Sequence, residues 1–174
     1  MKKAFVLGST GQDGSYMCEL LLKKKYKVYA LVRKSATGNT KNIDHLINNK
    51  NIFDKNFFLV KGDLNDHNSI SNIISTIKPT EIYNFADQDH VGWSFAIPSY
   101  SLMTTSHSLI NILESIKSTN KNIKYFHPLS SNMFGKTKLK MQNESTPFNP
   151  QSVYAISKVT CFHLSNLYRN VYGL

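Results

Sequence analysis

Cysteine is scarce in this sequence, and its scarcity excludes two kinds of protein. Only Cys18 and Cys161 are present, far apart in the chain. A pair at that spacing forms neither a disulfide framework nor the clustered ligands of a structural metal site. We therefore expect a reducing, cytoplasmic setting and no bound metal.

Long hydrophobic runs are missing as well. The N-terminal segment MKKAFVLG carries two lysines, but its apolar run Ala4–Leu7 ends at Gly8. Such a run is much shorter than the core of a signal peptide, about 7–15 residues, or a membrane span, about 20. A soluble protein with no membrane partner is expected.

Acidic residues are few: 11 Asp and Glu stand against 21 Lys and Arg, which gives a formal net charge of +10. A basic excess of this size suits nucleic acid, a membrane surface or a phosphorylated small molecule. The lysines are scattered rather than gathered in a stripe, which argues against nucleic acid. The composition favours a phosphate-bearing small ligand.

The 174 residues, 41% of them hydrophobic, are enough for one compact domain. Short apolar runs bounded by turn residues predict buried strands at Ala4–Leu7, Val28–Val32, Asn56–Val60, Glu81–Phe85 and Ile123–Phe126. Because helical patterns separate these runs, we predict an α/β fold. It should be a doubly wound parallel sheet with helices on both faces, forming one domain over residues 1–174.

Four segments carry the apolar spacing of amphipathic helices. They are marked by Tyr16, Met17, Leu20 and Leu21; by Ile70, Ile73, Ile74 and Ile77; by Leu109, Ile112, Leu113 and Ile116; and by the segment Val153 to Tyr172. Asp66 or Asn65 is expected to cap the second helix and Pro79 to end it. The polar segment Ser35–Asn42 is predicted to be a loop.

A glycine-rich turn, GSTGQDG, follows the first predicted strand and opens a helix expected to begin near Ser15. In that setting Gly8 permits a tight turn, Gly11 lets the backbone approach a pyrophosphate, and Gly14 lets helix and strand pack closely. The helix N-terminus adds exposed N–H groups that favour an anion. A turn that only reverses the chain is the alternative, but the order strand, turn, helix favours a dinucleotide site.

The end of the second strand indicates which dinucleotide. An acidic residue there accepts a hydrogen bond from a ribose 2′-hydroxyl, whereas a basic residue binds a 2′-phosphate. The chain reads Arg33, Lys34, Ser35, so NADP is favoured over NAD, the alternative being a solvated basic pair. At the end of the third strand, Asp63 in Gly62-Asp63-Leu64 could accept from the adenine amino group or simply lie in a helix-entry turn.

The stretch YAISK places Tyr154 and Lys158 four residues apart, on one face of a helix. A nearby ammonium stabilises a phenolate, which can then exchange a proton while hydride moves. By itself the spacing is common, and a surface lysine beside a half-buried tyrosine is the alternative. With the glycine turn, and with Ser130 and Ser131 expected at the end of the fifth strand facing the same crevice, the combination points to a redox site.

These features together resemble the extended short-chain dehydrogenase/reductase superfamily and, within it, the GDP-mannose 4,6-dehydratase family. The resemblance runs along the whole chain. Beyond GSTGQDG and YAISK it includes RKS from Arg33, IDHL from Ile43, GDLND from Gly62, PTEIYN from Pro79, QDHV from Gln88, Ser94-Phe95, ESTPFNP from Glu144 and YRNVYGL from Tyr168.

The resemblance implies a reaction on a GDP-sugar with internal recycling of NADP, in a homo-oligomeric enzyme. Tyr154 takes the proton of the sugar C4 hydroxyl, Lys158 holds the tyrosine ionised and binds the nicotinamide ribose, and Ser130 hydrogen-bonds the C4 oxygen. Elimination of water and return of the hydride at C6 complete the cycle. The cofactor contacts implied are Gly8, Ser9, Thr10, Gly11, Gln12, Asp13, Gly14, Arg33, Lys34, Ser35, Asp63, Leu64, Phe85, Ala86, Gln88, Tyr100, Tyr154 and Lys158.

The sequence departs from the family pattern at the chemical centre. Asn132 occupies the position of the glutamate that acts as base and acid in the elimination, and an amide cannot do this near neutral pH. Asp87 stands where the family has alanine and Asp89 where it has serine, so they either replace the lost base or damage the cofactor site. Ser106 and Ser108 replace glycines and are expected to crowd the cofactor.

Two alternatives to the dehydratase stay open. An epimerase or keto-sugar reductase of the same superfamily needs the hydroxyl, tyrosine and lysine but not the glutamate. A non-catalytic dinucleotide-binding or subunit-interaction module would keep only the fold. The family carries roughly as much chain again beyond the position of Leu174, including the region that binds the GDP-sugar, so the substrate domain is expected to be absent here.

Overall fold

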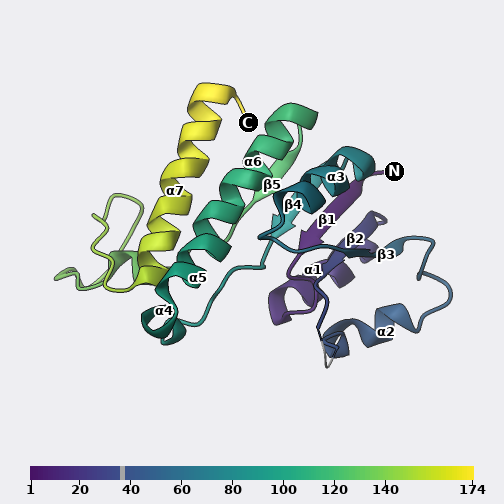
Figure 1. Ribbon diagram of the computed structural model, residues 1–174, viewed down its shortest axis with the longest axis horizontal. Helices are drawn as coiled ribbons and strands as arrows, with labels where there is room; N and C mark the ends of the chain where they lie inside the picture. Colours follow the sequence, from purple (N-terminus) through teal and green to yellow (C-terminus); the bar gives the residue numbers. More distant parts are fainter. Residues whose placement is uncertain (36–37) are drawn as a thin grey trace.

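The computed structural model describes residues 1–35 and 38–174. Five parallel strands form its sheet in the order β3-β2-β1-β4-β5 (Figure 1). They are β1 (Lys3–Leu7), β2 (Lys27–Val32), β3 (Phe57–Lys61), β4 (Glu81–Asn84) and β5 (Lys124–Phe126). The predicted α/β fold is confirmed, and each predicted strand is present with its ends moved by a residue or so.

The helical segments follow in chain order. They are α1 (Gln12–Lys23), the 3₁₀ turn η1 (Lys41–Ile43), α2 (Asp44–Ile47), α3 (His67–Ile77), α4 (Trp93–Ala96), α5 (Pro98–Leu102), the π-helix η2 (Met103–His107), α6 (Ser108–Thr119), the 3₁₀ turn η3 (Ser131–Phe134) and α7 (Val153–Tyr172). The four amphipathic helices predicted are α1, α3, α6 and α7. In the predicted loop 35–42, Ala36 and Thr37 lie outside the described residues, and Lys41 already belongs to η1.

Two local expectations are settled by the helix ends. The first helix begins at Gln12 rather than near Ser15, because Gly11 is its N-cap and Asp13 already lies in the first turn, where the helix dipole favours a carboxylate. The second predicted helix, α3, is capped by Asp66, whose side chain accepts from the backbone N–H of Ser69 at 3.2 Å. It ends at Ile77, just before Pro79.

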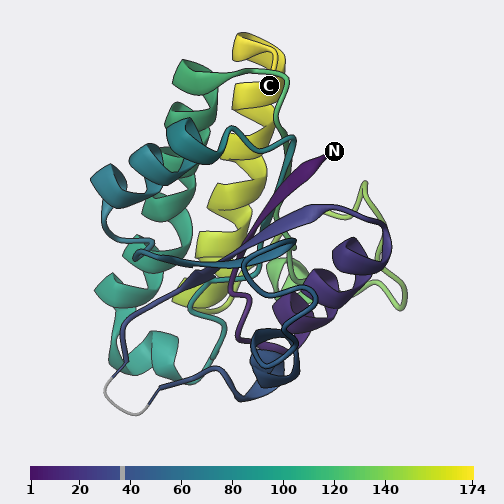
Figure 2. The ribbon, with the colours of Figure 1, turned by 90° about the vertical axis from the view of Figure 1, so that its right-hand side faces the viewer.

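Helices cover both faces of the sheet (Figures 1 and 2). Alternate β1 residues point to opposite faces, as a strand requires. Phe5 and Leu7 pack with isoleucines of α3 and α6, while Ala4 and Val6 pack with apolar residues of α1 and α2. A third cluster joins α6 to α7 through Leu109, Leu113, Cys161 and Tyr168. The chain therefore has two buried layers, with α7 held on the α6 side.

The strand order reverses beside β1, since the chain moves from β1 through β2 to β3 and then returns to place β4 on the other side of β1. In open α/β sheets a ligand binds at the carboxyl ends of the strands at such a switch point. The loops after β1 and β4 meet there, because the amide of Phe85 donates to the carbonyl of Leu7 at 2.9 Å.

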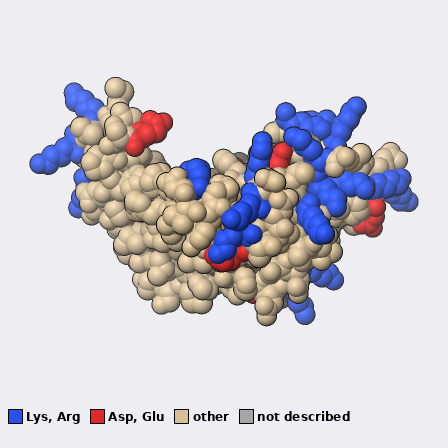
Figure 3. All heavy atoms as spheres, turned by 90° about the horizontal axis from the view of Figure 1, so that it is seen from above, with Lys and Arg blue, Asp and Glu red and all other residues tan. Residues whose placement is uncertain are grey.

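The basic residues do not form one continuous stripe on the face shown in Figure 3. Lys and Arg side chains lie mainly over one half of the molecule and at the opposite tip, with a broad uncharged surface between them. Within the described part of the chain, no helix has the length and apolar character needed to span a membrane. No cluster of His, Cys, Asp and Glu there could hold a metal ion.

Candidate functional site

A crevice of about 700 Å³ lies at the switch point. Loops that follow four of the strands supply its walls. Among its lining residues are Gly8 and Thr10 after β1, Arg33, Lys34 and Ser35 after β2, Asp63 and Leu64 after β3, Ala86, Asp87, Gln88 and Asp89 after β4, and Tyr100 from α5. This volume is in the usual range for cofactor sites, about 300–1,000 Å³.

The crevice gathers ten of the residues predicted to contact a cofactor: Gly8, Thr10, Arg33, Lys34, Ser35, Asp63, Leu64, Ala86, Gln88 and Tyr100. The other eight are not among the residues that line it: Ser9, Gly11, Gln12, Asp13, Gly14, Phe85, Tyr154 and Lys158. Ser9 is buried and donates to the carbonyl of Leu31 at 2.8 Å, so its hydroxyl joins β1 to β2. Phe85 contacts the ring of Phe126, while Gln12 and Asp13 are exposed at the start of α1.

The three glycines of the turn have different tasks. Gly8 has a φ of +75°, and a Cβ there would lie 2.5 Å from the backbone of Phe85; a Cβ on Gly14 would lie 2.1 Å from the Gly8 carbonyl oxygen. A Cβ on Gly11 would meet only that oxygen, at 3.3 Å. Gly8 and Gly14 are thus required by packing, whereas Gly11 leaves an open backbone beside the α1 N-terminus. That cradle fits a pyrophosphate.

The basic pair after β2 reaches the crevice. Arg33 and Lys34 are exposed, and Arg33 Nη1 donates to the Tyr100 hydroxyl at 3.3 Å. Tyr100 is anchored on α5, whose Ser101 donates to Gln88 Oε1 at 2.9 Å. A guanidinium held in this way at the rim offers its remaining N–H groups to an anion.

Tyr154 and Lys158 lie in the first two turns of α7 on one side of the helix. Ser152 fixes the start of the helix, because its side chain accepts from the backbone N–H of Ala155 at 3.1 Å. Both site residues are buried, and Lys158 Nζ lies 5.9 Å from the centre of the Tyr154 ring. The predicted pairing on one helix face is therefore present.

Lys158 has a second partner, the carboxylate of Asp87. Its ammonium contacts Asp87 Oδ2 and donates to the Pro128 carbonyl oxygen at 2.8 Å. His127 Nε2 lies 3.2 Å from the same Oδ2. Burial alone would raise the pKa of Asp87, but His127 and Lys158 outweigh it and hold that pKa below its ordinary value. Asp87 is therefore an ionised partner of the lysine.

Ser130 follows the carboxyl end of the fifth strand, four residues beyond its last residue. β5 ends at Phe126, and Ser130 caps the 3₁₀ turn η3, because Pro128 cannot donate to a strand ladder. The Ser130 hydroxyl oxygen accepts from the backbone N–H and from the side-chain amide of Asn132, both at 3.2 Å. Asn132 is exposed, so the position of the expected carboxylate carries a solvated amide.

The two serines that replace glycines are turned away from the crevice, so the expectation that they crowd a cofactor is wrong. Ser106 is on η2 and donates to the carbonyl of Ser157 on α7 at 3.3 Å, and Ser108 donates to the carbonyl of Thr104 at 2.5 Å. Both hydroxyls are buried against helices, and neither residue lines the crevice.

Neither thiol is suited to nucleophilic chemistry. Burial raises the pKa of Cys18 and of Cys161 to about 12, so both are protonated near neutral pH, and only a thiolate attacks well.

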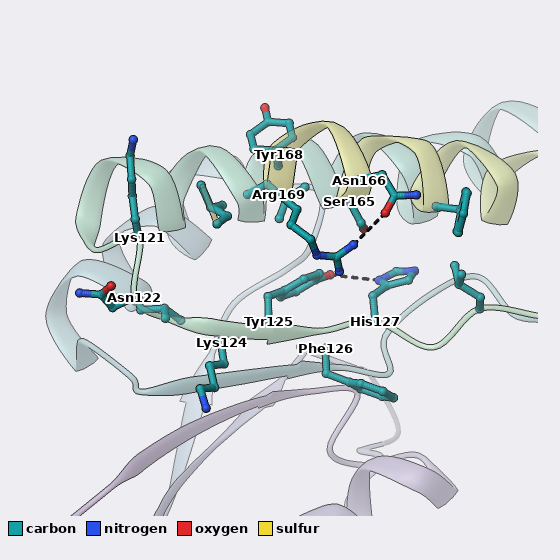
Figure 4. Close-up of a pocket in the computed structure, with 15 residues that line it drawn as sticks. Lys121, Asn122, Lys124, Tyr125, Phe126, His127, Ser165, Asn166, Tyr168 and Arg169 are labelled. Atoms are coloured by element: carbon teal, nitrogen blue, oxygen red, sulfur yellow. Dashed lines mark hydrogen bonds between the residues drawn. The ribbon is translucent and has the colours of Figure 1, made fainter. Parts of the chain in front are cut away.

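The analysis of the sequence missed His127 and Tyr125. Both point toward α7 into a groove of about 550 Å³, while Lys124 and Phe126 point to the other side of β5 (Figure 4). Burial raises the pKa of Tyr125 well above its ordinary value. The available signal was a pair of polar ring side chains two residues apart at the end of β5, hence on one side of the extended chain.

The chain was compared with known families and proteins. A family model described as GDP-mannose 4,6 dehydratase matches residues 5–174. The chain belongs to this family. It is 42% identical to GDP-mannose 4,6 dehydratase 1 of Arabidopsis thaliana and 35% identical to GDP-mannose 4,6-dehydratase of Vibrio cholerae, in each case over 99% of the chain. It covers 49% and 47% of those proteins, so it spans about half the length of these relatives.

Solved structures support the fold. The UDP-Glc/GlcNAc 4-epimerase of Campylobacter jejuni aligns with a TM-score of 0.86 at 20% identity, covering 97% of this chain and 49% of that one. The dTDP-glucose 4,6-dehydratase of Streptomyces venezuelae, solved with NAD, aligns with a TM-score of 0.85 at 24% identity, covering 99% and 53%. The chain therefore shares its fold with these two nucleotide-sugar enzymes.

Proposed function

We propose that the chain is the NADP-binding part of a nucleotide-sugar enzyme that acts on GDP-mannose to form GDP-4-keto-6-deoxymannose and water. The observation that carries this proposal is the crevice at the switch point, which joins the glycine turn, Arg33 and the loop that bears Asp87. The family membership supports GDP-mannose as substrate. The basic rim supports the phosphorylated dinucleotide over NAD.

Each residue has a defined task in this proposal. When bound, NADP⁺ supplies a temporary acceptor for a sugar hydride, held by the glycine turn, Arg33 and Lys34. Lys158 favours the phenolate form of Tyr154, and this phenolate accepts the proton of the C4 hydroxyl and becomes a neutral phenol. Ser130 donates its hydroxyl hydrogen to the C4 oxygen, a direction that its present hydrogen bonds leave open, since its oxygen only accepts from Asn132.

A second function is favoured by one specific observation. Asn132 is an exposed amide. It suits a 4-epimerase or keto-sugar reductase, because these enzymes need no base at that position, whereas the elimination of a dehydratase does. A non-catalytic module is the third candidate, and the pairing of Lys158 with Asp87 supports it.

The reaction product separates these functions. The protein is incubated with GDP-mannose and NADP⁺, and the sugar is examined by mass spectrometry. Loss of one water, abolished by Tyr154→Phe, is the result expected of the dehydratase. A product of unchanged mass but altered stereochemistry supports the epimerase, and no change in sugar or nicotinamide absorbance supports the module.

Arg33→Gln is predicted to weaken NADPH binding about tenfold or more and to leave NADH binding nearly unchanged, because only NADPH carries the 2′-phosphate that Arg33 would contact. Fluorescence titration with each dinucleotide measures this. Arg169→Gln, which removes an exposed arginine of α7 outside the crevice, is the matched control. Equal weakening of NADPH and NADH binding in Arg33→Gln would rule out the 2′-phosphate contact.

We further propose that the protein is cytoplasmic and forms a homo-oligomer. Leu102, Met103 and Ile156 are 43%, 53% and 47% exposed on α5, η2 and α7, and α5 contacts α7. Adjacent exposed apolar side chains are typical of subunit contacts. Light scattering that gives the mass of a single chain at micromolar concentration would refute the oligomer.

A further inference from the structure

The side chains of Lys158, Asp87 and His127 form a buried cluster, being 5%, 4% and 3% exposed. Asp87 Oδ2 is shared by the lysine and the histidine, whereas Asp87 Oδ1 is buried without a hydrogen-bond partner among the described residues. The lysine and the histidine thus converge on one oxygen. Burial makes these contacts strong, because little water screens them.

The orientation of His127 follows from its neighbours. Asn84 Oδ1 accepts from the backbone N–H of Ala86 at 3.0 Å, so the amide nitrogen faces Tyr125 Oη at 3.1 Å and His127 Nδ1 at 3.2 Å. An amide nitrogen only donates, which makes Nδ1 the acceptor. In a neutral imidazole the hydrogen is then on Nε2, the atom that lies 3.2 Å from Asp87 Oδ2.

Lys158 is therefore held by residues that follow β4 and β5. Its ammonium group contacts Asp87 and Pro128. Tyr154, with which it is proposed to act, is more distant, since Lys158 Nζ lies 5.9 Å from the centre of the Tyr154 ring. A carboxylate in contact cancels most of the field that the ammonium exerts on other groups. A hydroxyl of a bound dinucleotide would therefore approach a lysine whose ammonium group is already paired with Asp87.

We infer that Asp87 and His127 are positioning residues that hold Lys158, so that a bound dinucleotide must compete with Asp87 for the ammonium group. The competition rests on the proposed NADP binding; the holding of Lys158 does not. Asp87 supplies the charge, and His127 Nε2 lies against the same carboxylate oxygen at 3.2 Å, without hydrogen-bond geometry. Asn84 and Tyr125 orient the imidazole from the other side.

The holding of Lys158 is tested by the ¹H–¹⁵N signal of its ammonium group, assigned by its loss in Lys158→Arg. A held, buried ammonium exchanges slowly and gives a resolved signal. Asp87→Ala is expected to abolish the signal, and His127→Leu to broaden it. His127→Gln, which retains an N–H donor, should give a signal as sharp as that of the wild type. The matched control is Glu19→Gln, which alters the exposed carboxylate that lies 3.0 Å from His45 and should leave the signal intact. An unchanged signal in Asp87→Ala overturns the inference.

The competition is tested by titration with NADPH, using Asp87→Asn because it keeps the shape of the side chain. This variant should bind NADPH about tenfold more tightly than the wild type, with Glu19→Gln within twofold. Equal affinity of Asp87→Asn and the wild type overturns the competition. If no variant binds NADPH, the proposed function and the competition both fail, and the ammonium signal alone still decides whether Asp87 holds Lys158.

Discussion

Replacing Asn132 by glutamate is expected to raise the rate of GDP-mannose dehydration about 10²–10⁴-fold, the usual contribution of a general acid–base group. The amide of Asn132 neither accepts the C5 proton nor delivers one to the departing hydroxyl, whereas a carboxylate exchanges protons near neutral pH. The side chain is exposed, so the larger residue requires no repacking. Formation of the 4-keto-6-deoxy sugar, measured by mass spectrometry, gives the rate.

Asn132→Gln is the matched control, since it adds the same methylene group without the carboxylate. Hydride transfer to NADP⁺, followed by nicotinamide absorbance, should be similar in all three proteins, because Tyr154, Lys158 and Ser130 are retained. An equal gain in Asn132→Gln, or wild-type dehydration as fast as that of Asn132→Glu, would show that position 132 is not the missing base.

Asp87→Ala should lower the free energy of unfolding by about 3–5 kcal/mol, the typical cost of removing one partner from a buried ion pair. The change leaves the ammonium of Lys158 with the Pro128 carbonyl and removes the anion beside His127. Urea unfolding near neutral pH measures the difference. Glu19→Ala removes a carboxylate from an exposed contact with His45, whose side chain is 54% exposed, and should cost about 1 kcal/mol or less. Similar losses in both variants would contradict the buried pair.

The contribution of Asp87 also has a defined pH dependence. Because the folded protein holds the pKa of Asp87 below its ordinary value, folding is favoured by the ionised form. The stabilisation should be fully present above about pH 5, where the unfolded carboxyl is also ionised, and should be lost as the pH falls below about 4 toward the folded pKa. The difference in the free energy of unfolding between the wild type and Asp87→Ala should therefore become smaller in acid.

The sequence was sufficient for the sheet and the main helices because local signals and tertiary packing agree there. The segment Val153 to Tyr172 is helical over its whole predicted length, with Ser152 as its cap and Cys161 and Tyr168 facing α6. The short helices α4 and α5 and the π-helix η2 were not predicted. They are too short for an apolar period, and a π-turn depends on how the helix packs against its neighbours.

The parts of the candidate site that depend on local sequence could be predicted. The contacts between residues far apart in the chain could not. The glycine turn and the spacing of Tyr154 and Lys158 follow from local geometry. The partner of Lys158 does not, because Asp87 and His127 come from the ends of two different strands, 71 and 31 positions earlier by residue number. Sequence suggested that Asp87 either replaces the base or damages the site. The structure shows that it pairs with the lysine, and both suggestions stay predictions.

NADPH titration of the wild type and of Gly11→Ala decides whether a dinucleotide at the switch point is bound through the open backbone at Gly11. The new Cβ would meet only the Gly8 carbonyl oxygen, at 3.3 Å, so the free energy of unfolding should change by about 1 kcal/mol or less. We predict saturable NADPH binding by the wild type, weakened about tenfold or more in the variant. No saturable binding, or equal binding by both proteins, would contradict the account.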